Sequence, residues 1–268
     1  MVIGIDIGGS TTKIISTDGG ELYAPLFVRA ADPVASLFGA FGKFIDQNSL
    51  ELGQVKKIII TGVGASHISR PIYGINTQRV DEFTSIGRGG LALSGLSQAI
   101  IVSMGTGTAL VKATPEGCTH LGGTGLGGGT ILGLASKMLH VHSIETLVDM
   151  AERGNLRNVD LSVSDISKEA LGGLPPSTTA SNFGKMLDGA TQEDIARGIL
   201  NMVLESIGAL ARFAMLSSGL EDIVLTGNLS TLGLCKRMYK DFADLLGIHI
   251  TIPKHSEFAT ALGAALEG

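Results

Sequence analysis

The N-terminal stretch limits most strongly how this chain can fold, because two apolar runs flank a turn of small and hydroxyl-bearing residues. The first run, residues 2–5, ends at Asp6, and the second follows the turn from Lys13. Glycine in such a turn lets backbone N–H groups approach phosphate oxygens closely, since it has no Cβ. We therefore predict a β-hairpin whose turn holds phosphate. An ordinary glycine-rich hairpin is the simpler alternative.

We expect each part of this hairpin to contribute to the phosphate site. Asp6, at the strand end, is placed to hold Mg²⁺ through water, because magnesium prefers oxygen ligands and keeps much of its hydration. The pattern is not a Walker motif, which needs Gly-Lys-Ser/Thr at the start of a helix. It is not a Rossmann fingerprint either, since the residues after the turn are typical of a strand. The predicted phosphate-binding residues are Asp6, Ile7, Gly8, Gly9, Ser10, Thr11, Thr12 and Lys13.

Composition narrows the class of protein. A length of 268 residues allows one large domain or two modest ones, and 44% hydrophobic residues with 17% charged ones indicate a globular chain. The net charge of −5, without a basic block, argues against nucleic acid as a partner. No apolar run approaches the length needed to span a bilayer. The start lacks a signal-peptide pattern, and two cysteines are too few for a disulfide framework. We expect a cytoplasmic protein.

Strand and helix patterns alternate along the chain, which favours an α/β fold. Strands are expected at residues 2–5, 13–17, 57–61, 99–103, 108–113, 222–226 and 249–252. Helices are expected at residues 33–47, 191–216 and 232–246. A capping-box-like pair, Thr191 and Asp194, starts the longest helix, and Gly219 suits its end. Residues 157–181 are rich in Pro, Gly and Ser, and we expect loops there.

A weak internal repeat points to a nucleotide cleft. The pattern of strand, Gly/Thr turn and strand at residues 6–13 recurs at residues 103–110, and two such hairpins facing each other would clamp a phosphate chain. A later apolar strand ends in a Gly227-Asn228 turn suited to adenosine. This order is similar to that of the actin, hexokinase and heat-shock-chaperone superfamily. The resemblance implies two RNase-H-like α/β halves around the cleft, here residues 1–97 and 98–268.

Longer motifs are more specific than the repeat. They occupy residues 80–83, 104–108, 122–134, 149–154, 180–184 and 261–264. The most distinctive are the glycine-rich stretch 122–134 and Ala180-Ser181-Asn182-Phe183-Gly184. Through these motifs the chain resembles type II pantothenate kinases nearly from end to end. The resemblance implies a homodimer that transfers the γ-phosphoryl group of ATP to the 4′-hydroxyl of pantothenate, the first step of coenzyme A synthesis, with Mg²⁺.

The same resemblance assigns roles to particular residues. Glu82 falls on the catalytic carboxylate, which would accept the proton of the attacking hydroxyl. Thr106 lies in the second phosphate hairpin, and Asn228 on the adenosine side. The remaining ATP-binding residues are Gly128, Gly129, Thr130, Ile131 and Leu132. They begin a predicted helix whose N-terminus would offer free N–H groups to ATP phosphates.

Two positions depart from the family pattern and concern the acceptor substrate. His120 stands where the family usually has an arginine that holds the pantothenate carboxylate, and Thr84 where it often has Asp. Histidine near neutral pH offers at most a partial charge, whereas arginine offers a permanent charge and a bidentate fork. Arg88 or Arg153 could compensate. Pantothenate is the expected substrate, and a neutral relative such as pantetheine is the alternative.

Two other classes of function stay open at this point. One is a nucleotide-binding homologue that has lost catalysis, suggested by His120 and Thr84. The other is a dehydratase-activator-type ATPase, whose iron–sulfur cluster needs thiolates such as Cys118, although Cys235 lies far along the chain. The long helix at residues 191–216 is a candidate dimer interface, or it is buried within one subunit.

Overall fold

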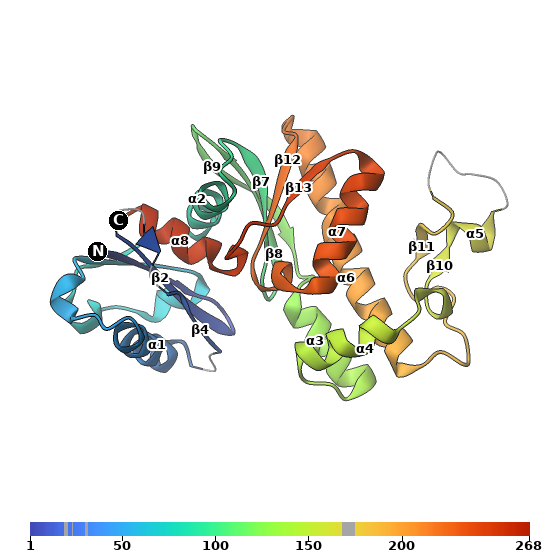
Figure 1. Cartoon of the computed structure of the whole chain (residues 1–268), viewed down its shortest axis with the longest axis horizontal. Helices are drawn as coiled ribbons and strands as arrows, with labels where there is room; N and C mark the ends of the chain where they lie inside the picture. Colours follow the sequence, from blue (N-terminus) through green and yellow to red (C-terminus); the bar gives the residue numbers. More distant parts are fainter. Residues whose placement is uncertain (19–20, 23, 30–31, 168–174) are drawn as a thin grey trace.

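The computed structural model describes residues 1–18, 21–22, 24–29, 32–167 and 175–268. These residues form two large sheets with helices on their faces (Figure 1). The first sheet has the order β3-β2-β1-β5-β6, and β4 also pairs with β2. Its strands are β1 (Val2–Ile7), β2 (Thr11–Asp18), β3 (Glu21–Leu22), β4 (Leu26–Arg29), β5 (Lys57–Thr61) and β6 (Thr77–Arg79).

The second sheet repeats this design in the order β13-β12-β7-β8-β9. Its strands are β7 (Ala99–Met104), β8 (Thr108–Thr114), β9 (Gly117–Thr124), β12 (Asp222–Thr226) and β13 (His249–Thr251). In both sheets the first two strands in chain order form an antiparallel hairpin, and a later strand joins the first one in parallel. A two-stranded sheet of β10 (Leu161–Ser162) and β11 (Thr179–Ser181) lies beyond the second sheet (Figure 1).

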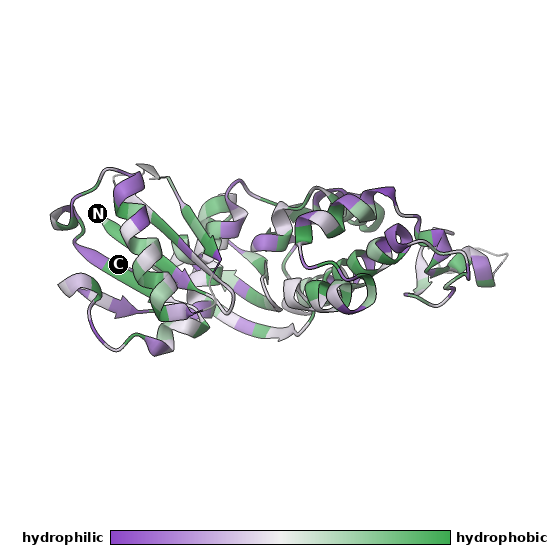
Figure 2. Ribbon diagram, turned by 90° about the horizontal axis from the view of Figure 1, so that it is seen from below, coloured by the Kyte–Doolittle hydropathy of each residue, from purple (hydrophilic) through white to green (hydrophobic). Residues whose placement is uncertain are grey.

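Helices cover the sheets and connect them. They are α1 (Pro33–Gln47), α2 (Glu82–Ser94), α3 (Gly128–Leu139), α4 (Ile144–Arg153), α5 (Val163–Ile166), α6 (Gln192–Ser218), α7 (Gly233–Leu246) and α8 (Ala259–Leu266). Short 3₁₀ turns are η1 (Leu52–Gln54), η2 (Val63–His67), η3 (Ile72–Gly74), η4 (Leu156–Asn158), η5 (Asn228–Thr231) and η6 (Ser256–Phe258). Helix α1 closes the first core, and α3, α4, α6 and α7 close the second. In Figure 2 the central strands of the first sheet are mostly hydrophobic.

Most predicted elements are confirmed, but strand β9 was missed, and the expected loops at residues 157–181 also hold regular structure. The helix at residues 33–47 and the strands at 57–61 and 222–226 have the predicted bounds. The Thr191–Asp194 capping box is formed, and α6 ends at Gly219 in the left-handed region. Strand β9 was not expected, because its glycines hide the strand pattern. The stretch 157–181 is not only loop, since it holds β10, α5 and β11; residues 168–174 within it lie outside the described residues.

Helices α2 and α8 lie between the two sheets, as Figure 1 shows. Helix α2 comes from the N-terminal part but packs on the second sheet, and α8 returns from the C-terminal end to pack on β1. Their crossing needs glycine: a Cβ on Gly263 would lie 1.8 Å from the Ser85 carbonyl oxygen, and one on Gly89 would lie 1.7 Å from that of Ala259. The two helices therefore couple the halves, and the division into residues 1–97 and 98–268 stays a prediction.

Helix α6 contradicts the expectation that no apolar run approaches the length needed to span a bilayer. With 27 residues it is long and apolar enough, by length and composition, to cross a membrane. Half of its most apolar stretch is buried inside the fold, and its side chains form much of the second core. A buried core helix passes the same test, and the packing favours that interpretation.

Candidate functional site

Three neighbouring strands of the first sheet place polar side chains in one row. The register pairs Asp6 of β1 with Lys13 of β2 on one side and with Thr61 of β5 on the other. Laterally paired residues project from the same face of a sheet, so the three side chains share a face. The Lys13 Nζ atom lies 3.9 Å from an Asp6 carboxylate oxygen, and both residues are buried. The first hairpin thus presents a buried carboxylate with a cation beside it.

The surroundings of Asp6 suit a hydrated divalent cation. Burial raises the pKa of the Asp6 carboxyl, and the charge of Lys13 offsets only part of that rise. A buried carboxylate that is incompletely compensated gains from a further positive charge. Carboxylate oxygen is also the ligand type that magnesium prefers. Asp6 therefore fits the role expected for it, as the residue that would hold Mg²⁺ through water.

Glu82 lies within electrostatic reach of this row. It is the first residue of α2, whose N-cap Asp81 accepts a hydrogen bond of 2.8 Å from the Thr84 N–H. The pKa of Glu82 is raised, first by burial and then by the negative charges of Asp6 and Asp81, while Lys13 lowers it. The fold thus places the predicted catalytic carboxylate where the charges of Asp6 and Lys13 act on it. Thr84 is occupied at the helix cap, because its hydroxyl also donates to Asp81.

The two glycine-containing hairpins face each other, as the sequence repeat predicts. The Ser10 hydroxyl, in the β1–β2 turn, lies 3.2 Å from the Thr106 hydroxyl in the β7–β8 turn. A second link joins the halves, because Arg29 of β4 donates to Glu145 of α4 at 2.7 Å. Side chains 96 residues apart in sequence therefore meet between the two hairpin turns.

The start of α3 is placed as predicted, but not all of its N–H groups are free. The Gly128 N–H donates to the Gly105 carbonyl at 2.8 Å, and the Gly129 N–H donates to the Thr106 carbonyl at 2.9 Å. The helix packs so closely on the second hairpin that a Cβ on Gly127 would lie 2.5 Å from the Thr106 carbonyl oxygen. The expectation of free amides is wrong for these two residues. In this structure their N–H groups fix the hairpin turn.

The other predicted nucleotide residues differ in their exposure. Ile7, Thr12 and Ile131 are fully buried, main chain included, so none of the three offers an exposed group to a nucleotide in this structure. Gly9 and Ser10 are exposed at the turn, which Gly8 closes by donating to the Thr11 carbonyl at 2.9 Å. Thr130 donates its hydroxyl to the Gly125 carbonyl at 2.8 Å, and Leu132 is half-buried.

Asn228 lies beside the second hairpin. It follows Gly227, whose φ of 85° is in the left-handed region and whose Cα faces the Met104 backbone. A Cβ on Gly227 would lie 2.5 Å from the Met104 carbonyl oxygen, so only glycine allows this approach. The next residue, Leu229, shares the second core with Ile131 of α3, and a Cβ on Gly128 at the start of that helix would lie 3.8 Å from it. The second hairpin, α3 and the Asn228 turn therefore converge, as the sequence order predicts.

His120 lies on β9 and stacks on Phe83, the residue after Glu82. The ring centroids are 3.8 Å apart and the planes differ by 10°. This contact brings His120 to the end of α2 that carries Glu82. The two arginines considered as compensating cations are engaged elsewhere, since Arg88 pairs with Glu267 at 3.3 Å and Arg153 pairs with Glu193 at 3.7 Å.

Sequence reasoning missed Thr61, Gly62 and Phe83. A Cβ on Gly62 would lie 2.7 Å from an Asp6 carboxylate oxygen, so this glycine makes room for the site. The Thr61-Gly62 dipeptide recurs as Thr226-Gly227 after the corresponding strand of the second sheet. A repeat search extended to these strands would have found the first pair. No sequence signal indicated the Phe83 stack.

The cysteines give no support for cluster binding. Burial raises the pKa of the Cys118 thiol, and burial raises that of Cys235 to about 12. Metal binding needs thiolate, which both environments disfavour. Within the described residues there is no group of three or more His, Cys, Asp or Glu side chains that could hold a metal ion.

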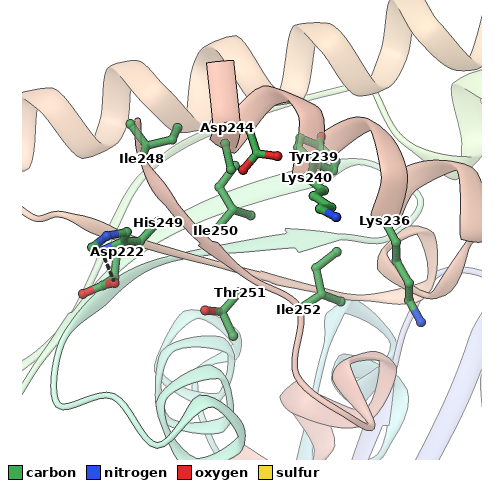
Figure 3. Close-up of a pocket in the computed structure, with 11 residues that line it drawn as sticks. Asp222, Lys236, Tyr239, Lys240, Asp244, Ile248, His249, Ile250, Thr251 and Ile252 are labelled. Carbon is green, nitrogen blue, oxygen red and sulfur yellow. Dashed lines mark ion pairs between the residues drawn. The ribbon is translucent and has the colours of Figure 1, made fainter. Parts of the chain in front are cut away.

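A separate cavity of about 630 Å³ lies between α7 and the edge strand β13 (Figure 3). Its lining includes Lys236, Lys240 and Asp244, and an ion pair of 3.5 Å joins His249 to Asp222. None of the predicted site residues lines it. The candidate site therefore stays with the two hairpins and the start of α2.

The two hairpin-bearing sheets with helices between them define an actin-like ATPase fold. The activator of 2-hydroxyisocaproyl-CoA dehydratase from Clostridium difficile with bound ADPNP matches 99% of this chain and 93% of that chain, with a TM-score of 0.69 and 18% identity. Component A of (R)-2-hydroxyglutaryl-CoA dehydratase from Acidaminococcus fermentans matches 100% of this chain and 96% of that chain, with a TM-score of 0.69 and 17% identity. At these identities the likeness concerns the fold alone.

Comparison of the amino-acid sequence with known families and proteins identifies the family of this chain. The Fumble family model matches residues 96–267, and the chain belongs to that family. A type II pantothenate kinase of Staphylococcus aureus (strain bovine RF122 / ET3-1) is 28% identical over 275 residues, covering 98% of both chains. Another, from Staphylococcus aureus (strain MRSA252), is 27% identical over 279 residues and covers 100% of both. The resemblance to type II pantothenate kinases is therefore confirmed.

Proposed function

We propose that this chain transfers the γ-phosphoryl group of ATP to the 4′-hydroxyl of pantothenate, as an ATP:pantothenate 4′-phosphotransferase. The observation that carries the proposal is that Glu82, at the start of α2, lies within electrostatic reach of Asp6 and Lys13, on the hairpin whose turn meets that of the second half. The kinase names of the relatives and the ADPNP in a structural relative support ATP as the donor. The buried row and Glu82 together supply what phosphoryl transfer needs, namely charge neutralisation and a base.

In this mechanism each residue has one task. Glu82 accepts the proton of the acceptor hydroxyl as that oxygen attacks the γ-phosphorus, and the bond from phosphorus to the ADP oxygen breaks. Lys13 faces the negative charge of the phosphates, and the two hairpin turns orient them. Asp6 would hold Mg²⁺ through water, and the bound ion would supply charge neutralisation at the phosphates. The pKa of Glu82 is raised toward neutral pH, and a general base works best when its pKa lies near the operating pH.

His120 governs the choice of acceptor in this proposal. Arg88 and Arg153 are paired with other carboxylates, so His120 is the group proposed to contact the acceptor carboxylate. We expect His120→Arg to lower KM for pantothenate about tenfold with little change for pantetheine, because arginine adds a permanent charge. A coupled kinase assay with pantothenate, pantetheine and a pantothenamide measures this. An unchanged KM for pantothenate would refute the role of His120. A Phe83→Leu variant in the same assay tests whether the ring stack between Phe83 and His120 is needed for that role.

The same assay, together with ATP binding and iron content, distinguishes the alternative functions. Turnover on pantetheine with little on pantothenate would identify the neutral relative as the substrate. ATP binding without turnover on any of the three acceptors would indicate the non-catalytic homologue. The activator-type ATPase is favoured only if purified protein carries stoichiometric iron. We place the reaction in the cytoplasm, with small molecules rather than nucleic acid or membrane as partners.

We also propose a homodimer formed through α6. Three large apolar side chains spaced by three residues on this helix are exposed, namely Leu210, Phe213 and Leu216, and Phe213 is 62% exposed. Such spacing places them along one helix face. We expect Phe213→Asp to shift the protein from dimer to monomer in sedimentation velocity. Leu245→Asp, at an exposed position on α7, is the matched control and should leave the dimer intact. A monomeric unmodified protein would refute the proposal.

A further inference from the structure

The ends of β5 and β12 have the same local structure. Each strand ends in Thr followed by a glycine in the left-handed region, with φ of 87° at Gly62 and 85° at Gly227. Each glycine leads into a 3₁₀ turn, η2 or η5. The registers also correspond, because Thr61 pairs with Asp6 and Thr226 pairs with Ser103. The two threonines therefore occupy equivalent places in the two halves.

Their hydroxyl groups differ in one respect. The Thr226 hydroxyl donates to the Val102 carbonyl at 3.4 Å. The Thr61 residue is 1% exposed, and its hydroxyl has no hydrogen-bond partner among the described residues. A buried hydroxyl without a partner costs free energy, and buried polar groups in native proteins are generally paired. The equivalent backbone surroundings do not account for this difference, and a group from outside the chain would satisfy the Thr61 hydroxyl.

The position of Thr61 indicates where that partner comes from. It lies on the face of the sheet that carries Asp6 and Lys13. On its other side β5 pairs with β6, and the Val80 N–H donates to the Ile60 carbonyl at 3.0 Å just before α2 begins at Glu82. In strand order, Thr61 thus stands between Asp6 and the start of α2. Thr12 also has an unpartnered buried hydroxyl, but its register partner, Ile7, belongs to the α1 core.

We propose that Thr61 is a further binding residue of the nucleotide site, and that its hydroxyl hydrogen-bonds an oxygen of the bound magnesium nucleotide. A hydroxyl can donate to a phosphate oxygen or accept from a water held by the metal, and both are oxygens that would lie beside Asp6. The inference rests on the proposed function for the presence of a nucleotide. It goes further in assigning a ligand contact to a residue outside the glycine turns.

The test compares Thr61→Val, Thr61→Ser and the unmodified protein in two measurements. Valine has nearly the shape of threonine without the hydroxyl. We expect Thr61→Val to raise Tm of the nucleotide-free protein by about 2–4 °C, because an unpaired buried hydroxyl is removed. The same variant should raise Kd for MgADP about tenfold in calorimetric titration, because a hydrogen bond to the ligand is lost. Thr61→Ser should restore Kd to within about threefold.

Thr226→Val is the matched control for stability. Its hydroxyl has a protein partner, so its removal should lower Tm rather than raise it. Titration with ADP in the presence of a chelator separates the two oxygen sources. If the Kd of Thr61→Val still differs from that of the unmodified protein without Mg²⁺, the hydrogen bond goes to phosphate. If the difference vanishes, the bond goes to metal-bound water.

Two results would overturn the inference. One is a Thr61→Val variant with lowered Tm and unchanged Kd for MgADP, which would show a partner within the protein. The other is unchanged values in both measurements. Failure of the proposed function is distinguishable, because absent turnover on every acceptor leaves the MgADP comparison intact.

Discussion

Glu82→Gln is expected to lower kcat on the acceptor by about 10²–10⁴-fold while changing ATP affinity only a few-fold. Glutamine keeps the size and shape of the side chain but cannot accept a proton from the attacking hydroxyl. The first hairpin, which holds the phosphates, is unaltered by the change. A coupled kinase assay gives kcat, and calorimetric titration with ADP gives nucleotide affinity.

Glu267→Gln is the matched control for this substitution. Glu267 follows α8 and pairs with Arg88, which lies on α2 as Glu82 does. Because Glu267 is partly exposed, its amide variant should retain near-normal kcat. Turnover of Glu82→Gln close to that of the control would contradict the assignment of the base.

The pH dependence gives a second check on Glu82. A base must be deprotonated, and burial, followed by the charges of Asp6 and Asp81, raises the pKa of this carboxyl. As pH falls through that raised pKa, Glu82 gains a proton and kcat falls. The acidic limb of the kcat profile should therefore lie above the ordinary glutamate range. A limb within the ordinary range would argue against Glu82 as the titrating base.

Gly263→Ala is expected to destabilise the protein by about 3 kcal/mol or more, at the upper end of overpacking effects. The new Cβ would lie 1.8 Å from the Ser85 carbonyl oxygen and 2.7 Å from the Gly89 nitrogen. Both neighbours are backbone atoms of α2, which cannot move aside without separating the two helices. Because α2 also carries Glu82, activity should fall with stability. Urea denaturation measures the change in free energy of unfolding.

Gly42→Ala is the matched glycine substitution. Gly42 lies in α1 and is exposed, and a Cβ there meets no atom within 4 Å. Alanine has the higher helix propensity, so this variant should gain roughly 0.5–1 kcal/mol. If Gly263→Ala were as stable as Gly42→Ala, the close crossing of α2 and α8 would not exist in solution.

Local sequence patterns predicted the parts of the fold that depend on neighbouring residues. The strand bounds at residues 57–61 and the capping box of Thr191 with Asp194 were predictable, because apolar periodicity and cap chemistry act over a few positions. Strand β9 was not, since its glycines carry no strand signal and its pairing with β8 determines it. The resemblance identified Glu82, but not its raised pKa.

By itself, the sequence determined the α/β class, the two hairpins and the family, because each is written in contiguous residues. Only the tertiary structure decided which groups meet. It brought Ser10 to Thr106, stacked His120 on Phe83, and placed Thr61 in a row with Asp6. It also engaged the Gly128 and Gly129 amides with the second hairpin rather than leaving them free. These outcomes depend on packing between segments distant in sequence, above all the glycine-mediated crossing of α2 and α8, which no local pattern records.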